Sequence, residues 1–163
     1  MKPVLLATDG SPTAEKATAT AIDLARLLGT DIVIVSVWEV AFAGYSAMGF
    51  APIPMNGDLA RLSEKEASLV IAEAAARAEE AGVETRSVVL RGFPVEAICD
   101  AADKFAPQFL IIGSHGRGAM KRALFGSVST GVLHHATCPV LVVPAEKVDI
   151  QAAKNGSREE ITA

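Results

Sequence analysis

Residues 113–127 (GSHGRGAMKRALFGS) combine closely spaced glycines with three basic side chains, Arg117, Lys121 and Arg122. Glycine lets backbone N–H groups approach a ligand closely and tolerates a positive φ. Successive N–H groups in such a turn form an anion-binding nest, and a following helix that Ser127 is expected to cap adds free donors and a positive dipole. The segment therefore predicts a phosphate site; the alternative is a surface loop with solvated basic side chains.

Two familiar phosphate-binding motifs do not fit this segment. A Walker A loop requires Lys and then Ser or Thr directly after its second glycine, whereas Gly118 is followed by Ala119 and Met120. The dinucleotide-binding pattern GxGxxG is also absent, and no glycine loop follows the first expected strand. A phosphate site here would need a different geometry.

Asp9 follows a short apolar run at residues 3–8, at the carboxyl end of an expected strand. Its carboxylate could accept hydrogen bonds from ribose hydroxyls, hold a metal ion, or cap the next helix together with Ser11. A phospho-acceptor role is discounted, because the third expected strand ends in Leu90-Arg91-Gly92 and supplies no reactive aspartate. We assign no metal ligands.

His115 is the obvious candidate acid or base in the glycine-rich segment. No trio of nucleophile, base and orienting residue surrounds it in the sequence, so we interpret it as a backbone spacer and predict no catalytic residue. Cys99 and Cys138 stand 39 positions apart without metal-ligand spacing. A disulfide framework is therefore not expected, and a reducing cytoplasm fits.

The composition bounds the function classes. The 163 residues suit one domain, 50% of them are hydrophobic, and the formal net charge is -4. A pI near 5.4 argues against a nucleic-acid partner. No apolar run approaches the roughly 20 residues of a membrane span, so we expect no membrane insertion.

Apolar runs alternate with helical patterns along the chain. Strands are expected at 3–8, 31–38, 83–90, 108–112 and 139–143, with helices beginning at Pro12, about Leu59, Pro94 and Ser127. This alternation predicts an α/β fold, a flavodoxin-like and Rossmann-like three-layer sandwich around a five-stranded parallel sheet of order 3-2-1-4-5. Ligands of such sheets bind where the order reverses, at the carboxyl ends of the strands. Thr8-Asp9-Gly10 and Gly113-Ser114-His115-Gly116 should meet there.

At this point the sequence resembles the universal stress protein family. The spaced signature G-x2-G-x9-G-(S/T) is met by Gly113, Gly116, Gly126 and Ser127, and TDGS after the first strand and the ending CPVLVVP are also similar. The resemblance covers about residues 2–144. Because the chain retains the full signature, it resembles the ATP-binding branch of the family. One departure is Gln108, where the family usually has Asp.

The resemblance implies a role for each position in an ATP site. Thr8 and Asp9 would line the nucleoside, Val37 would meet the adenine edge through its backbone, and Gly113 would approach the ribose. Ser114 and His115 complete the loop. The remaining positions would surround the phosphates: Gly116, Arg117, Gly118, Gly126, Ser127, Val128 and Ser129.

Three functions follow as hypotheses. The first is an ATP-binding stress-response module without enzymatic activity. In this module ATP, with or without Mg²⁺, would set the conformation or the assembly of the protein. The protein would in turn regulate a protein partner that the sequence does not identify. The alternatives are a slow ATP hydrolase and a cyclic-AMP-binding protein. The family also implies a homodimer through strand 139–143, with a larger oligomer left open. We expect the nucleotide-binding domain to span 1–144, a flexible tail at 145–163, and an apolar loop of unassigned role at 39–57.

Overall fold

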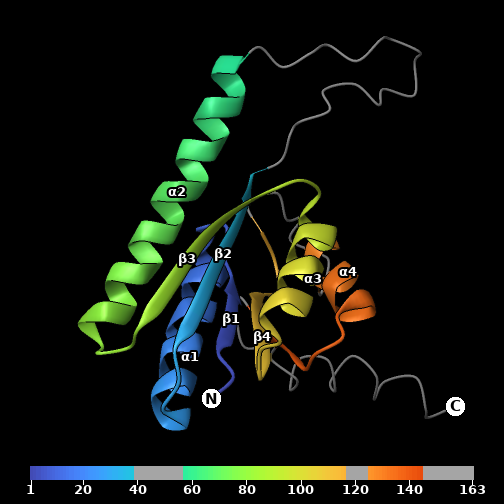
Figure 1. Cartoon of the computed structure of the whole chain (residues 1–163). Coiled ribbons are helices and arrows are strands. Elements are labelled where there is room, and N and C mark those ends of the chain that lie inside the picture. The colour runs from blue at the N-terminus through green and yellow to red at the C-terminus, as the bar shows by residue number, and fades with distance from the viewer. Residues whose placement is uncertain (39–56, 117–124, 145–163) are drawn as a thin grey trace, which may run out of the picture.

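Five short apolar segments pair into one parallel sheet of order β3-β2-β1-β4-β5 (Figure 1). The structure is a computed structural model that describes residues 1–38, 57–116 and 125–144. The strands are β1 (Val4–Ala7), β2 (Ile32–Trp38), β3 (Thr85–Arg91), β4 (Phe109–Gly113) and β5 (Val140–Val143). The predicted fold class and strand order are confirmed.

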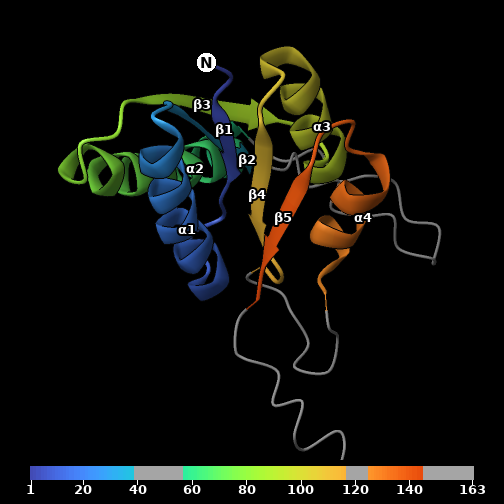
Figure 2. The same cartoon turned by 90° about the horizontal axis from the view of Figure 1, so that it is seen from below.

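Helices cover both faces of this sheet. The helices are α1 (Pro12–Leu28), α2 (Gly57–Glu80), α3 (Pro94–Phe105) and α4 (Ser127–His135). Figure 2 shows α1 and α2 on one side of the strands and α3 and α4 on the other. Each pair of helices packs against one face of the sheet and buries a separate apolar cluster there. The molecule therefore has three layers, with one part of the hydrophobic core on each side of the sheet. No helix among the described residues is long and apolar enough to cross a membrane.

The central strand β1 is the most enclosed part of the fold. All four of its side chains are buried, and Leu5 and Leu6 are 0% exposed. Their side chains alternate between the two clusters, with Leu6 facing α1 and α2 and Leu5 facing α3. Full burial of one leucine stabilises the fold by about 1.5–3 kcal/mol, so both faces of the sheet hold β1 and the residues that follow it in place.

Local sequence signals set the helix ends. Ser11 is the N-cap of α1 in extended conformation, its hydroxyl accepts a hydrogen bond from Ala14 N, and Pro12 occupies the first helical position, all as predicted. Gly29 ends α1 in the left-handed region at φ +62°. A glycine adopts that conformation without steric cost, which explains the stop.

The structure corrects two expected helix starts. Helix α2 begins at Gly57 rather than near Leu59. At α4 the N-cap is Gly126 and not Ser127, which is already the first helical residue. The first intrahelical bond there runs from Thr130 N to Gly126 O at 3.0 Å, so Gly126 is the residue at the boundary. The expected tail at 145–163 and all of the 39–57 loop except Gly57 lie outside the described residues.

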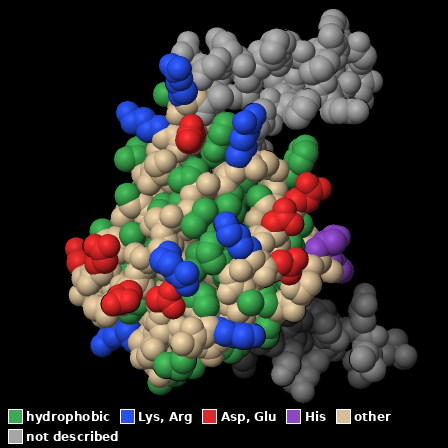
Figure 3. All heavy atoms as spheres, in the orientation of Figure 1, with side chains coloured by type: hydrophobic (Ala, Val, Ile, Leu, Met, Phe, Trp, Pro, Cys, Tyr) green, Lys and Arg blue, Asp and Glu red, His purple; other side chains and the backbone are tan. Residues whose placement is uncertain are grey.

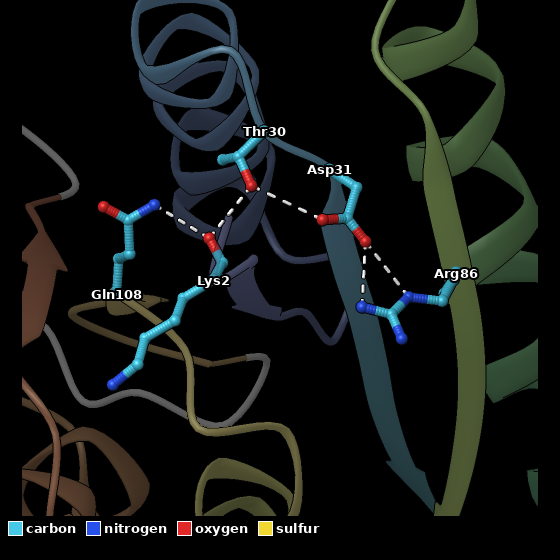
Figure 4. Close-up of polar contacts among 5 residues, drawn as sticks. All are labelled: Lys2, Thr30, Asp31, Arg86 and Gln108. Carbon is cyan, nitrogen blue, oxygen red and sulfur yellow. Dashed lines mark hydrogen bonds and ion pairs between the residues drawn. The ribbon is translucent and has the colours of Figure 1, made fainter.

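Gln108, the residue that departs from the family pattern, lies at the amino-terminal edge of the sheet (Figure 4). Its side-chain amide donates a hydrogen bond to Lys2 O at 2.8 Å, and Thr30 Oγ1 donates to the same carbonyl at 2.9 Å. Beside them, Arg86 pairs with Asp31 at 2.8 Å. An ionised aspartate at position 108 could not donate to Lys2 O, so the glutamine side chain supports the start of β1.

Candidate functional site

The ends of β1 and β4 lie side by side at the point where the strand order reverses. Residues Val4 to Ala7 pair with β2 on one side and with β4 on the other. The chain leaves β1 into α1 on one face and leaves β4 towards α4 on the opposite face. This divergence opens the sheet's carboxyl edge to ligands, and the segments Thr8-Asp9-Gly10 and Gly113–Gly116 both lie there.

Asp9 and Gly116 approach each other across this edge. A Cβ added to Gly116 would stand 2.7 Å from Asp9 Oδ2, closer than side-chain carbons normally approach. The other carboxylate oxygen, Oδ1, accepts a hydrogen bond from Ser11 N at 3.0 Å. Asp9 therefore joins the start of α1 to the glycine-rich segment and serves the capping role that its sequence position also suggested.

The turn at residues 113–116 is fastened to the first turn of α1. The hydroxyls of Ser11 and Thr13 both donate to His115 O, Ser11 at 3.2 Å. A Cβ at Gly113 would stand 2.9 Å from both the backbone carbon and Oγ1 of Thr13. Gly113 is thus needed where β4 touches α1. Sequence reasoning missed Thr13, because a threonine in a first helical turn carries no signal of a contact with residue 113 or 115.

A second set of hydrogen bonds joins Ser114 to the start of α4. Gly126 N donates to Ser114 O at 2.7 Å, and Ser129 Oγ donates to the same oxygen at 2.9 Å and to Gly126 O at 3.0 Å. Ser114 and Ser129 are 1% and 2% exposed. The carbonyl of Ser114 and the hydroxyl of Ser129 thus hold the two ends of the loop together.

The first turn of α4 presents backbone donors to this edge. Because the helical bonds begin at Thr130 N, the N–H groups of Ser127, Val128 and Ser129 have no acceptor within the helix. The positive end of the helix dipole lies at the same place. The anion-binding character expected of this terminus stays a prediction.

Close packing, and not an unusual backbone angle, accounts for two of the signature glycines, Gly113 and Gly116. In the described residues the glycines with positive φ are Gly10, Gly29, Gly82 and Gly92. Gly126 is extended, at φ -75° and ψ 165°, and neither Gly113 nor Gly116 has a positive φ. The three described glycines of the 113–127 segment therefore do not use the positive φ that glycine tolerates. Space beside Thr13 and Asp9 explains Gly113 and Gly116 instead.

Val37 lies where β2 runs beyond the end of β1. The last hydrogen bond between them goes from Thr8 N to Val35 O at 3.0 Å. Residues two apart on a strand point their backbone groups to the same side, so Val37 turns its N–H and C=O towards the space above β1. This backbone edge of Val37 therefore faces the Thr8–Asp9 side of the sheet.

The structure thus sorts the predicted site residues into three groups. Those with an accessible surface are Asp9, Val37, His115, Gly116, Gly126, Ser127 and Val128; the buried ones are Thr8, Gly113, Ser114 and Ser129; Arg117 and Gly118 lie outside the described residues. His115 Nδ1 lies 3.0 Å from Ser114 Oγ. Across the described ranges, no group of three or more His, Cys, Asp or Glu could hold a metal ion.

The cysteines lie away from this edge, against the α3–α4 half of the core. Cys99 is on α3 and Cys138 precedes β5, and both are free thiols. Burial raises the pKa of the Cys99 thiol, and the nearby Asp103 carboxylate raises that pKa further. Burial likewise raises the pKa of Cys138. Protonated thiols of this kind pack as small apolar groups.

Comparison with known proteins decides the family. The model of the universal stress protein family matches residues 1–144. The chain belongs to this family. A universal stress protein of Methanocaldococcus jannaschii is 30% identical over 147 residues, which are 90% of this chain and 84% of that relative.

Two other universal stress proteins are similar to this chain, one in its solved structure and one in sequence. A solved structure of the Archaeoglobus fulgidus universal stress protein in complex with dAMP is 25% identical, with a TM-score of 0.66 over 88% of this chain and 98% of that chain. A Mycobacterium tuberculosis universal stress protein is 34% identical over 86% of this chain, but this chain spans only 44% of that longer relative. This chain therefore spans less than half the length of that relative.

Proposed function

We propose that this chain is an ATP-binding regulatory module in which the bound nucleotide sets conformation or assembly. The observation that carries the proposal is the approach of Asp9 to Gly116 at the point where the strand order reverses. A hydroxyl-binding carboxylate and a phosphate-binding backbone must lie this close together to hold the ribose and phosphates of one nucleotide.

The described residues fit the parts of a nucleotide. Asp9 would accept from ribose hydroxyls, and Val37 would bind the base through its backbone. The phosphates would lie on the N–H groups of Gly116 and of the first turn of α4, because anions are stabilised at such donors. Support comes from the Archaeoglobus fulgidus relative, which was solved with dAMP. Arg117 and Gly118 would extend the same cradle.

A regulatory role is favoured over an enzymatic one by the functional groups available. Asp9 and His115 are the titratable side chains that the described site offers, and both have structural partners. Mg²⁺ is commonly held by one or two carboxylates together with substrate phosphates, so it would enter with the nucleotide and contact Asp9. We also propose a cytoplasmic location, because the two cysteines indicate no disulfide framework and therefore fit a reducing compartment.

The proposal includes a homodimer through the exposed edge of β5. This strand ends the sheet, and Leu141 on it is 39% exposed. An unpaired edge strand offers backbone donors and acceptors to a second copy. Pairing of two β5 strands would continue the sheet across both subunits.

The test is to identify the nucleotide that the purified protein carries and to titrate it. Acid extraction followed by chromatography should release an adenine nucleotide. Calorimetry with ATP, GTP and cyclic AMP should then give the tightest binding for ATP. Preference for cyclic AMP would favour the cyclic-nucleotide alternative, and absence of binding to all three would overturn the proposal.

A further inference from the structure

Among the described residues, the carboxyl end of β2 pairs with a neighbouring strand on one side only. Pairing with β1 stops at Ala7 and Val35, whereas pairing with β3 continues through Trp38 and Arg91. Within the sheet, the last residues of β2 therefore pair with β3 alone, while the Val37 side chain packs against the core on the α3–α4 side. Val37 lies in this overhanging part, and the proposed function uses its backbone.

The direction of the backbone groups alternates along β2. Ile32 N donates to Glu84 O and Gly92 N donates to Trp38 O, so residues 32 and 38 bond towards β3. Thr8 N donates to Val35 O, so residue 35 bonds towards β1. Val37 shares the direction of Val35. Its N–H and C=O thus face the side of β1, whereas its neighbours Ser36 and Trp38 face β3.

Arg91 and Trp38 form a side-chain contact at this end of β2. They are directly opposite each other in the β2–β3 register, and the Arg91 guanidinium carbon lies 5.2 Å from the centre of the Trp38 ring. Trp38 is half-buried and Arg91 is exposed. A guanidinium over an indole is the strongest common pairing of this type. The hydrogen bond from Gly92 N to Trp38 O, at 3.3 Å, closes the same corner.

We propose that Arg91 and Trp38 are positioning residues for base recognition. Their stack holds the end of β2 so that Val37 presents one donor and one acceptor at a constant spacing. This inference rests on the proposed function. Adenine offers a donor (N6–H) and an acceptor (N1) that match such an edge, whereas guanine offers the opposite order at these positions. The contact between Arg91 and Trp38 therefore contributes to nucleotide choice without touching the nucleotide.

The experiment compares three variants of the full chain. Arg91→Met removes the cation and keeps the length, Arg91→Lys keeps a cation over the ring, and Arg86→Met is the matched control. Arg86 is on the same strand, pairs with Asp31 and lies 5.7 Å from the Phe105 ring, but at the other end of β3. Each variant is titrated with ATP, GTP and inorganic tripolyphosphate, and the order parameter of the Val37 amide is measured by NMR relaxation without nucleotide.

We expect Arg91→Met to weaken ATP binding by about three- to tenfold. The ratio of the affinity for ATP to the affinity for GTP should fall, whereas tripolyphosphate binding should stay unchanged. The Val37 order parameter should fall from the rigid range of about 0.85. Arg91→Lys should restore most of each value, and Arg86→Met should match the wild type.

Two results would overturn the positioning role. One is an Arg91→Met protein with an unchanged Val37 order parameter, whatever its nucleotide binding. The other is equal loss of ATP and tripolyphosphate binding, which would indicate general damage to the fold. A wild-type protein that binds no nucleotide would overturn the proposed function instead, and the order parameter would still decide whether the stack holds Val37.

Discussion

Asp9 Oδ2 lies where a side chain on Gly116 would have to be, 2.7 Å from the position of its Cβ. The two residues are 107 positions apart in the chain, and adjacent strand ends bring them together. A larger residue at 116 would move the carboxylate that we assign to the ribose. It would also cover the backbone that we assign to the phosphates.

Gly116→Val should therefore weaken ATP binding by at least tenfold, the equivalent of about 1.4 kcal/mol. The fold should persist, because Gly116 is exposed and outside the sheet. Calorimetric titration gives the affinity, and circular dichroism is the folding control. Ser127→Ala should cost less, since it leaves the helix N–H donors in place. A folded Gly116→Val protein with wild-type affinity would remove the basis of the site assignment.

Gly113→Ala should lower stability rather than only ligand binding. Its Cβ would stand 2.9 Å from the Thr13 backbone carbon, and backbone cannot move aside as a side-chain end can. Overpacking of this kind costs about 1–3 kcal/mol. Urea unfolding measures the change. Gly126→Ala is the matched control, because its nearest neighbour, Ser114 O, would be 3.4 Å away. Equal stability of the two variants would contradict the close contact between β4 and α1.

Leu141→Asp should dissociate the proposed dimer. Leu141 lies on the edge strand β5 and is 39% exposed, so the new charge would be trapped between paired strands. Sedimentation at micromolar concentration should show a dimer for the wild type and a monomer for the variant. Leu27→Asp, at an 82% exposed leucine on α1, should leave assembly unchanged. A monomeric wild-type protein would end the dimer proposal.

The thiols of Cys99 and Cys138 should react slowly in the native protein. Burial raises the pKa of both, so the neutral thiol is favoured and the reactive thiolate is scarce near pH 7. Iodoacetamide labelling followed by mass spectrometry should be slower in buffer than in urea. Because the folded pKa is the higher one, the associated stabilisation is complete below the unfolded pKa and is lost as pH rises towards the folded pKa. Equal labelling rates with and without urea would refute the shift.

Hydrolysis of ATP should stay below roughly 1 per second, the lower end of ordinary enzyme turnover. The reason is that Asp9 and His115 already serve the turns that contain them. A phosphate-release assay on the purified protein measures the rate. Faster turnover, abolished by a site variant such as Gly116→Val, would make the chain an enzyme.

Local signals in the sequence determined most of the fold. Ser11-Pro12 and Gly29 mark the ends of α1 because capping depends on atoms within one helical turn. Buried apolar runs of about five residues between helices are enough to predict a parallel sheet and its two covered faces. The flavodoxin-like strand order was then chosen among the few topologies that right-handed connections allow, and it placed Asp9 and the 113–116 turn at one edge.

Only the tertiary structure decided what each residue does at that edge. The closeness of Gly113 to Thr13 depends on how tightly β4 packs on α1, and no pattern within either segment encodes that distance. The same holds for Ser129, whose hydroxyl bonds to Ser114 across the loop. A glycine in the sequence announces either a positive φ or a lack of space. At Gly113 and Gly116 the reason for the glycine is lack of space, which results from packing between segments about a hundred residues apart.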